Sequence, residues 1–293
     1  MEHKIGVVLQ VLFGCAMVAA KTEQRTVTAK QAPDFALLSY DYQNEGGNSV
    51  TFHVNPMAKG VPFEIGFDKE SAVTANDVVT INIPDETGEL SLFATYSANS
   101  ISQLPPKIFS IKPIQITVLA AENSNTIIKA AVKTIKSLKF IEPDPVWIKT
   151  PYDLYYSSVR RSFSAIDENT VCLHRVLFNV STDQLLVQQD SSINGESLQI
   201  FTGNGWTLLQ LARQFTTSSS NDKFPTSDKY LVVYFTHTQG LESFYSVSFS
   251  APGIPMPPST TTLPPTTTKG SNRLSMNLWL LVGCFMLTKK YFN

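Results

Sequence analysis

The sequence predicts an all-β protein with two successive β-sandwiches, and three observations support this prediction. Apolar and polar residues alternate in short runs along most of the chain, polar turn-forming segments separate the runs, and a proline-rich segment interrupts them near the middle. Runs of four to eight residues rich in Val, Ile, Phe, Tyr and Thr are typical of antiparallel strands. Many short strands joined by polar turns are typical of two-layered sandwiches.

The predicted strands occur in both halves of the chain. They cover residues 50–54, 63–67, 78–83 and 90–96 in the first half, and 198–201, 230–235 and 244–249 in the second. Turn-forming residues separate them at 45–48, 84–88, 203–205 and 218–222. Residues 141–151 hold three prolines, which regular elements exclude, so this segment is expected to be an extended connector. The predicted domains are therefore residues 32–140 and 152–252.

For two segments, the choice between helix and strand needs further argument. Residues 208–215 read as a short helix. Residues 126–138 fit either an amphipathic helix, with lysines on one face, or a hairpin with the strand-like residues 116–121. The β-branched residues in both arms favour the hairpin, and the lysines then form a solvated face.

Both ends of the chain have the composition of processing or attachment signals. Residues 1–20 combine Lys4, an apolar run and small residues at the end, which predicts a cleaved secretory signal peptide. Residues 253–270 are dense in proline and threonine and predict an extended, O-glycosylated stalk. Residues 271–293 hold a short apolar run, which favours a GPI-attachment tail with attachment at Gly270 or Ser271. A short single-span helix and free secretion are the alternatives.

The lone cysteine of the predicted ectodomain is Cys172, because Cys15 lies in the signal peptide and Cys284 in the tail. A disulfide within the ectodomain is therefore excluded, and both cores must be stabilised by burial of apolar groups. Cys172 is expected to be a buried thiol, with an intermolecular disulfide as the alternative. Asn179-Val180-Ser181 is an N-glycosylation sequon, which predicts a glycan on Asn179.

No pattern in the sequence predicts a catalytic residue, a metal site or a cofactor. The histidines His53, His174 and His237 are far apart in sequence and are expected to face solvent or a rim. The acidic pairs Asp34/Asp41 and Asp85/Glu86 resemble a glycosidase pair no more than chance allows. A formal net charge of −1, with 16% charged residues, gives no sign of a nucleic-acid partner.

Aromatic residues and arginines gather around the predicted connector. They are Trp147, Tyr152, Tyr155, Tyr156, Arg160 and Arg161. Aromatic rings beside arginine are enriched in recognition surfaces, including those that stack on sugars. The alternative, which the sequence favours, is a wedge packed between the two domains.

Three segments of the second half resemble the CUB domain: residues 198–203, residues 231–235 and the closing run 244–249. Residues 63–67 and 90–96 look like a more divergent copy in the first half. With the stalk and tail, the chain is similar to the CUB-like-region cell-surface proteins of nematodes. The resemblance implies tandem CUB-like jelly-roll sandwiches, a position at the cell surface or in membrane rafts, and a role in innate immune defence against bacteria.

The sequence departs from the CUB pattern at two points. CUB domains have paired disulfides, which this ectodomain lacks. Many also bind Ca²⁺ through acidic residues; Glu196 matches the first such position, but Thr236 and His237 occupy the second. A neutral imidazole is a poor ligand for a hard cation, so no calcium site is expected.

These observations together predict a non-enzymatic recognition or adhesion protein on the extracellular face of the plasma membrane, with a protein or glycan ligand. A secreted hydrolase on a jelly-roll scaffold and a structural surface-coat component are the alternative functions.

Overall fold

The computed structural model describes residues 22–252, apart from residues 45–48, 75, 85–89, 122–123, 181–183 and 207–208. Strands make up most of these residues, so the prediction of an all-β fold is confirmed. The predicted signal peptide, stalk and tail lie outside the described residues. Within them, no helix is both long and apolar enough to cross a membrane.

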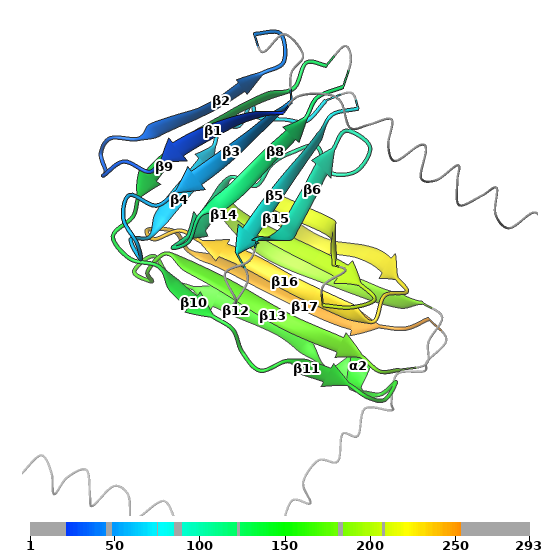
Figure 1. Ribbon diagram of the computed structural model, residues 1–293. Coiled ribbons are helices and arrows are strands. Elements are labelled where there is room, and N and C mark those ends of the chain that lie inside the picture. The colour runs from blue at the N-terminus through cyan, green and yellow to red at the C-terminus, as the bar shows by residue number, and fades with distance from the viewer. Residues whose placement is uncertain are drawn as a thin grey trace, which may run out of the picture. The chain divides into compact units, whose positions relative to one another are not determined.

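The first half of the chain forms two facing sheets (Figure 1). The five-stranded sheet has the order β1 (Glu23–Thr28), β3 (Val50–Asn55), β8 (Ile114–Leu119), β5 (Val78–Pro84), β6 (Leu90–Ser97). The four-stranded sheet has the order β2 (Ala36–Asp41), β9 (Ile127–Thr134), β4 (Phe63–Phe67), β7 (Lys107–Ser110). We call these strands the first sandwich.

The pairing of these strands is that of a jelly roll. The antiparallel pairs β2–β9, β3–β8, β4–β7 and β5–β6 alternate between the two sheets. The chain therefore behaves as one long hairpin rolled over itself, which is the jelly-roll topology. Strand β1 lies outside this scheme and adds to the edge of the sheet parallel to β3.

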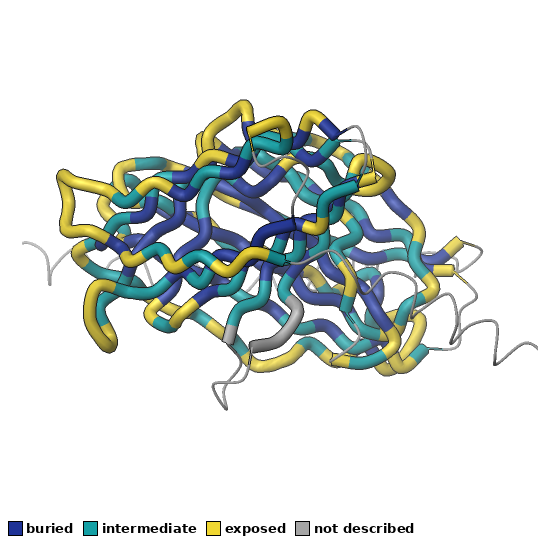
Figure 2. Tube along the Cα trace, turned by 45° about the horizontal axis from the view of Figure 1, so that its top comes forward, coloured by how far each residue is buried: buried dark blue, intermediate teal, exposed yellow. Residues whose placement is uncertain are grey.

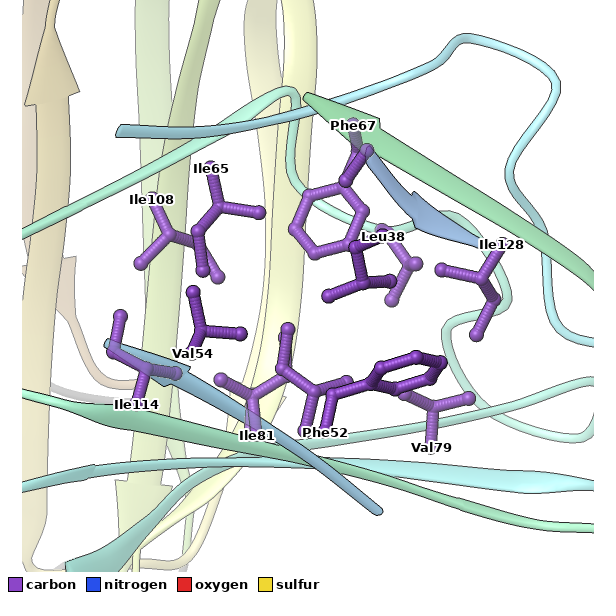
Figure 3. Close-up of a cluster of buried hydrophobic side chains, with 14 of the residues drawn as sticks. Leu38, Phe52, Val54, Ile65, Phe67, Val79, Ile81, Ile108, Ile114 and Ile128 are labelled. Carbon is purple, nitrogen blue, oxygen red and sulfur yellow. The ribbon is translucent and has the colours of Figure 1, made fainter. Parts of the chain in front are cut away.

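Alternation along each strand explains why the two sheets face each other. In β8, Ile114, Ile116 and Val118 are buried, whereas the residues between them are not. Successive strand residues point to opposite faces, so each sheet presents one apolar face. Figure 3 shows such side chains converging, among them Phe52 and Ile65. Fully burying one such side chain stabilises the fold by about 1.5–3 kcal/mol.

The second half of the chain forms the second sandwich from one continuous sheet. Its strands are β10 (Lys139–Ile141), β11 (Val146–Ile148), β12 (Ser158–Phe163), β13 (Thr170–Phe178), β14 (Leu185–Gly203), β15 (Gln210–Thr226), β16 (Tyr230–His237) and β17 (Ser243–Ser250), with the short helix α2 (Asp153–Tyr156) between β11 and β12. The order along the sheet is β10-β13-β16-β14-β17-β12, with β11 also on β13 and β15 also on β14.

The second sandwich repeats the jelly-roll scheme of the first. The antiparallel pairs are β12–β17, β13–β16 and the long hairpin β14–β15. Strand β14 pairs with β17 through Ser192 and with β16 from Ser197 onward, so it crosses from one layer to the other. Each of β14 and β15 thus takes the place of two strands of the first sandwich. As β1 does on β3, β10 and β11 add parallel to β13.

The crossing of β14 between layers is made at Gly195. The ladder of β14 with β15 is irregular between Gln189 and Leu198, and Gly195 has a φ of 78°. Glycine is the residue that adopts positive φ without steric cost. An exposed corner at Asn194 and Gly195 therefore lets one strand serve both layers.

The first sandwich covers the outer face of the second at β14, β16 and β13. Val171, Phe201, Val232 and Tyr234 belong to the same buried cluster as the core of the first sandwich. The ring of Phe93 lies 5.3 Å from that of Phe201 and 4.9 Å from that of Tyr234, between centroids. As a result, every residue from 231 to 237 is buried, and the inner positions along this run pack in the core of the second sandwich.

Polar side chains fix the same interface. Gln199 Nε2 donates to Tyr96 Oη at 2.8 Å and to Gln214 Oε1 at 2.9 Å. Tyr96 Oη in turn donates to Gln214 Oε1 at 3.3 Å, and Gln214 Nε2 donates to the carbonyl of Gln103 at 2.6 Å. Burial raises the pKa of Tyr96, so its hydroxyl stays protonated and remains a donor.

Two predictions about single segments are wrong. Residues 210–215 begin β15 instead of a helix, because Leu211 packs toward the first sandwich and Ala212 toward the second core, which is the alternation of a strand covered on both faces. Strands β8 and β9 both form, but not as a hairpin: β8 pairs with β3 and β9 with β2. The jelly roll places consecutive strands in opposite layers, where their apolar faces meet across the core.

The proline-rich segment contains two short strands. Strand β10 ends at Ile141 and β11 covers Val146–Ile148, both paired with β13. Pro143, Pro145 and Pro151 lie between or after these strands, where no ladder hydrogen bond is lost. The two strands in this segment belong to the edge of the second sandwich. Figure 2 shows the exposed residues mostly in loops and turns.

Replacing Gly195 with alanine is expected to destabilise the protein by about 1–2 kcal/mol, because a residue with a Cβ is strained at positive φ. The added Cβ would meet no atom within 4 Å, so backbone strain alone sets the cost. Denaturant unfolding measures it. The control is Gly66→Ala in β4, whose Cβ would lie at an ordinary 3.9 Å from the carbonyl oxygen of Ala131. Equal losses in both variants would show that the corner needs no glycine.

Candidate functional site: an aromatic platform on the second sandwich

The outer face of the second sandwich is only partly covered. Along β13, Val171, Leu173, Arg175 and Leu177 alternate with core residues and so share the outer face. Val171 and Leu173 pack against the first sandwich. Arg175 and Leu177, nearer the end of the strand, are half-buried. The strand thus leaves one end of this face open to solvent.

Aromatic rings occupy the open end. Trp147 on β11 lies opposite Leu177 on β13, which lies opposite Tyr230 on β16. Residues directly opposite in a ladder point to the same face. The ring of Trp206, in the turn after β14, meets that of Tyr230 edge-on with centroids 4.5 Å apart. We call Trp147, Leu177, Trp206 and Tyr230 the aromatic platform.

Solvent reaches the two tryptophans of the platform. Trp147 is 56% exposed and Trp206 is 40% exposed, whereas Leu177 and Tyr230 between them are half-buried. Exposing a tryptophan gives up the burial of a large apolar surface. Two exposed tryptophans on one sheet face are therefore a feature that folding alone does not explain.

Polar pairs border the platform. The guanidinium carbon of Arg175 lies 5.9 Å from the centroid of the Trp206 ring, and Arg175 Nη2 lies 2.8 Å from Glu142 Oε1. On the other side, Asn204 Nδ2 donates to Asp228 Oδ1 at 3.3 Å. The platform therefore combines flat apolar surfaces with hydrogen-bonding groups at its margin.

The aromatic residues that the sequence groups around the connector lie in different surroundings in the structure. Trp147 belongs to the platform, whereas Tyr152, just before α2, and Tyr156, the last residue of α2, are 57% and 76% exposed. Tyr155 is half-buried. The interpretation of these residues as a wedge between the domains is therefore wrong, because β11 and α2 sit at the end of β13 that the first sandwich does not cover. Arg160 and Arg161 occupy opposite faces of β12.

Sequence reasoning missed the rest of the platform. Leu177, Trp206 and Tyr230 lie 30 or more residues from Trp147, and only the ladder of β11, β13 and β16 brings them together. One signal was present: Tyr230 and Leu177 occupy outward positions of strands whose inward positions are apolar. Which outward positions the first sandwich covers depends on tertiary packing.

Cys172 is buried, as expected. It lies in a cluster of polar side chains in the core of the second sandwich. Tyr245 Oη donates to Cys172 Sγ at 3.1 Å, and Cys172 Sγ lies 3.4 Å from His174 Nε2. Burial raises the pKa of the Cys172 thiol and of Tyr245. Burial, together with the charge of Arg161, lowers the pKa of His174 to about 4. At neutral pH all three are uncharged, and an imidazole with so low a pKa is too weak a base to ionise the Cys172 thiol.

The expectation that the histidines face solvent or a rim is wrong for His174 and His237, which occupy inward positions. His237 and Glu196 are fully buried, with His237 Nδ1 2.7 Å from Glu196 Oε1. The same oxygen accepts the Thr238 N–H at 2.9 Å. The carboxylate at the position that matches a calcium ligand is thus directed into the protein. His53 is half-buried on β3, with Nε2 2.6 Å from Gln24 Oε1.

The remaining predicted residues lie apart from one another. Asp34 and Asp41 are seven positions apart along an extended segment, or roughly 20 Å, whereas glycosidase carboxylates lie about 5–9.5 Å apart. Asp41 caps a turn by accepting the Gln43 N–H at 3.1 Å. Asp85 and Glu86 lie outside the described residues, as do Gly270 and Ser271. Among the described residues, no three His, Cys, Asp or Glu side chains form a group able to hold a metal ion.

The predicted glycan position is accessible. Asn179 directly follows β13 and is exposed, and its backbone N–H donates to the carbonyl of Ile148 at 2.8 Å. Ser181 of the sequon lies outside the described residues. Glycosylation of Asn179 stays a prediction.

No protein-family model matches the sequence, and no curated protein matches it. Among solved structures, the CUB1-EGF-CUB2 domains of rat MASP-1 match 77% of this chain and 100% of their own, at 10% identity and a TM-score of 0.27. The corresponding human MASP-1/3 domains match 73% and 99%, at 10% identity and a TM-score of 0.27. PliG of Aeromonas hydrophila, a periplasmic inhibitor of g-type lysozyme, matches 39% and 99%, at 12% identity and a TM-score of 0.23. The assignment of the fold rests on the strand pairing described above.

The thiol of Cys172 is expected not to react with an aromatic disulfide reagent while the protein is folded, because the side chain is fully buried and protonated. Labelling followed by peptide mapping distinguishes Cys172 from Cys15 and Cys284. The account predicts label on Cys172 only at denaturant concentrations that unfold the protein. Label on Cys172 in native buffer, or a disulfide-linked dimer through it, would contradict the structure.

Proposed function

We propose that the protein is a non-enzymatic recognition protein whose aromatic platform binds carbohydrate. The observation that carries the proposal is the pair of exposed tryptophans, Trp147 and Trp206, on one sheet face with Tyr230 between them. A pyranose ring has a flat face of C–H groups and a rim of hydroxyls. Aromatic rings match the face, and the planar polar pairs Arg175–Glu142 and Asn204–Asp228 match the rim.

The surroundings of the platform favour a binding role over a catalytic one. Its polar groups are paired with each other, and its surface consists of rings and one leucine. Rings held on strands lose little conformational entropy when a ligand binds, because the sheet already fixes them. The platform therefore suits adhesion to a repeated surface sugar, for which many weak contacts act together.

Replacing Trp147 or Trp206 with alanine is expected to weaken binding to a glycan array about 5- to 10-fold each, since a stacked ring contributes roughly 1 kcal/mol or more. The matched control is Phe140→Ala, because Phe140 is also 56% exposed but lies beside Val171, near the opposite end of β13. Circular dichroism checks that each variant is folded.

Three outcomes would contradict the proposal of a non-enzymatic carbohydrate-binding protein. Equal loss of binding in the control would show that exposed aromatics act non-specifically. Binding to protein ligands alone, abolished by the tryptophan changes, would make the platform a protein interface. Release of new reducing ends from a bound glycan would favour the hydrolase alternative.

We further propose that the protein is held at the outer face of the plasma membrane and acts in innate defence against bacteria. The support is the signal-like segment 1–20, the stalk-like segment 253–270, the tail 271–293 and the resemblance to CUB-like-region proteins. On this proposal the array should show stronger binding to bacterial glycans than to host glycans.

A phosphatidylinositol-specific phospholipase is expected to release the protein from intact cells, because a GPI anchor attaches it through lipid alone. Immunoblotting of the supernatant measures the release. Alteration of both Gly270 and Ser271 to bulky residues should abolish surface attachment. Protein that stays on the cells after phospholipase treatment would favour a spanning segment instead.

A further inference from the structure

The second sandwich holds a pocket at the edge where its two layers face each other. It has a volume of about 310 Å³ and is lined by residues of β10, β12, β13 and the loop before β13. This volume lies at the small end of the range for ligand sites, about 300–1,000 Å³. It lies around Phe163 and Thr170, at the start of β13, whereas the platform lies at the end of that strand.

Arg161 is the distinctive residue of the pocket. Along β12, Val159 and Phe163 are buried and Arg160 is exposed, so Arg161 is on the inward face of the strand. Its guanidinium carbon lies 5.7 Å from the centroid of the Phe163 ring. None of the ion pairs recorded for the described residues involves Arg161.

The surroundings of Arg161 do not neutralise its charge. Its neighbour across the ladder is Tyr245, and the nearby Cys172 and His174 are uncharged at neutral pH. The Arg161 nitrogens do not belong to the buried polar atoms without partners in the described residues, so water reaches them and a ligand can replace that water. A carboxylate from outside would make two parallel hydrogen bonds with the guanidinium.

The remaining charges of the pocket lie nearer its mouth. Lys139 and Glu168 are exposed. Asp167 Oδ2 accepts the Ser164 N–H at 2.6 Å and the Ser164 hydroxyl at 3.0 Å, and these bonds hold the pKa of Asp167 below its usual range. The charge of Asp167 is therefore engaged in its own loop, whereas that of Arg161 is free for a ligand.

The rest of the lining is mixed. Ser162 and Thr170 bear hydroxyls, and Phe163, Ile141 and Ile166 offer apolar surface. The Thr170 hydroxyl already donates to the carbonyl of Glu168 at 2.8 Å, whereas Ser162, Lys139 and Glu168 are exposed and can bond to ligand hydroxyls. A hydroxylated ring that carries a carboxylate would satisfy both parts of the lining.

We propose that this pocket binds the carboxylate of an acidic monosaccharide, with Arg161 as the carboxylate-binding residue. The sugar hydroxyls then bond to the polar groups at the mouth, and the C–H face of the ring rests on the exposed side chain of Ile166. The site stands independently of the platform, and different residues test it.

The experiment is a titration of the full-length protein with D-glucuronate, observed by saturation-transfer NMR, with D-glucose and acetate as comparison ligands. Glucuronate is expected to bind at least about tenfold more tightly than glucose, the equivalent of one good charge-assisted interaction. It is also expected to bind more tightly than acetate. Equal binding of glucose would overturn the role of the carboxylate, and equal binding of acetate would overturn the assignment to a sugar.

Two adjacent arginines provide the matched variants. Arg161→Gln is expected to weaken glucuronate binding at least about tenfold, whereas Arg160→Gln, on the opposite face of the same strand, leaves it unchanged. Ile166→Asp gives a second test if Arg161→Gln fails to fold, because Ile166 is 87% exposed and its change cannot disturb the core. The new charge should weaken glucuronate binding more than glucose binding, because only glucuronate is repelled as well as deprived of the apolar contact. Unchanged glucuronate binding in Arg161→Gln or in Ile166→Asp, or no binding to the unaltered protein at millimolar concentration, would refute the proposal.

Discussion

The structure depends on a sheet that is buried on both of its faces. Strands β14, β16 and β13 pack their inward side chains in the core of the second sandwich and many of their outward side chains against the first. Phe201, Val232 and Tyr234 on the outer face complete a cluster that continues into the core of the first sandwich. The two sandwiches thus share apolar surface, and the burial compensates for the absence of disulfides in the described part of the chain, whose cysteine Cys172 is free.

The two sandwiches have the same scheme of strand pairing, but they differ in how many separate strands build it. The first is built from separate strands, whereas the second fuses them into β14 and β15, with a corner at Gly195. Continuous long strands give a broad flat face, and the first sandwich covers part of it. What stays uncovered, beside β11, is the place where the two tryptophans lie. The extra parallel strands β1 and β10 occupy sheet edges that would otherwise offer unpaired backbone groups.

The sequence predicted much of the fold, for a physical reason. Strands such as β3, β8 and β17 have one buried face and therefore show a clear alternation of apolar and polar residues. The prediction failed at the start of β15, which packs on both faces, although it succeeded for β16. In β15, Leu211 and Ala212 are consecutive apolar residues that contact different cores, and they were read as part of a helix. The run Leu231–Phe235 carried the same signal, since a continuous apolar run indicates a strand buried on both faces.

The sites were harder to predict than the fold. Trp147 was considered for a recognition surface, although the sequence favoured a wedge between the domains, and its neighbours in the platform come from strands that are distant in sequence. Arg161 was grouped with Arg160, although adjacent strand residues point to opposite faces and only one of them enters the pocket. Residues that act together in a jelly roll are seldom adjacent in sequence, because most strands pair with a strand that is distant along the chain.

Amide hydrogen exchange of the folded protein tests the shared sheet most directly. If the outer face of β16 is part of a common core, the amides of residues 231–236 should exchange only when the whole molecule unfolds. Their opening free energy should then equal that of the amides of β3 and β8 in the first sandwich. Exchange of β16 through an opening several kcal/mol lower, while β3 and β8 stay protected, would show that the sandwiches are independent and would contradict the account.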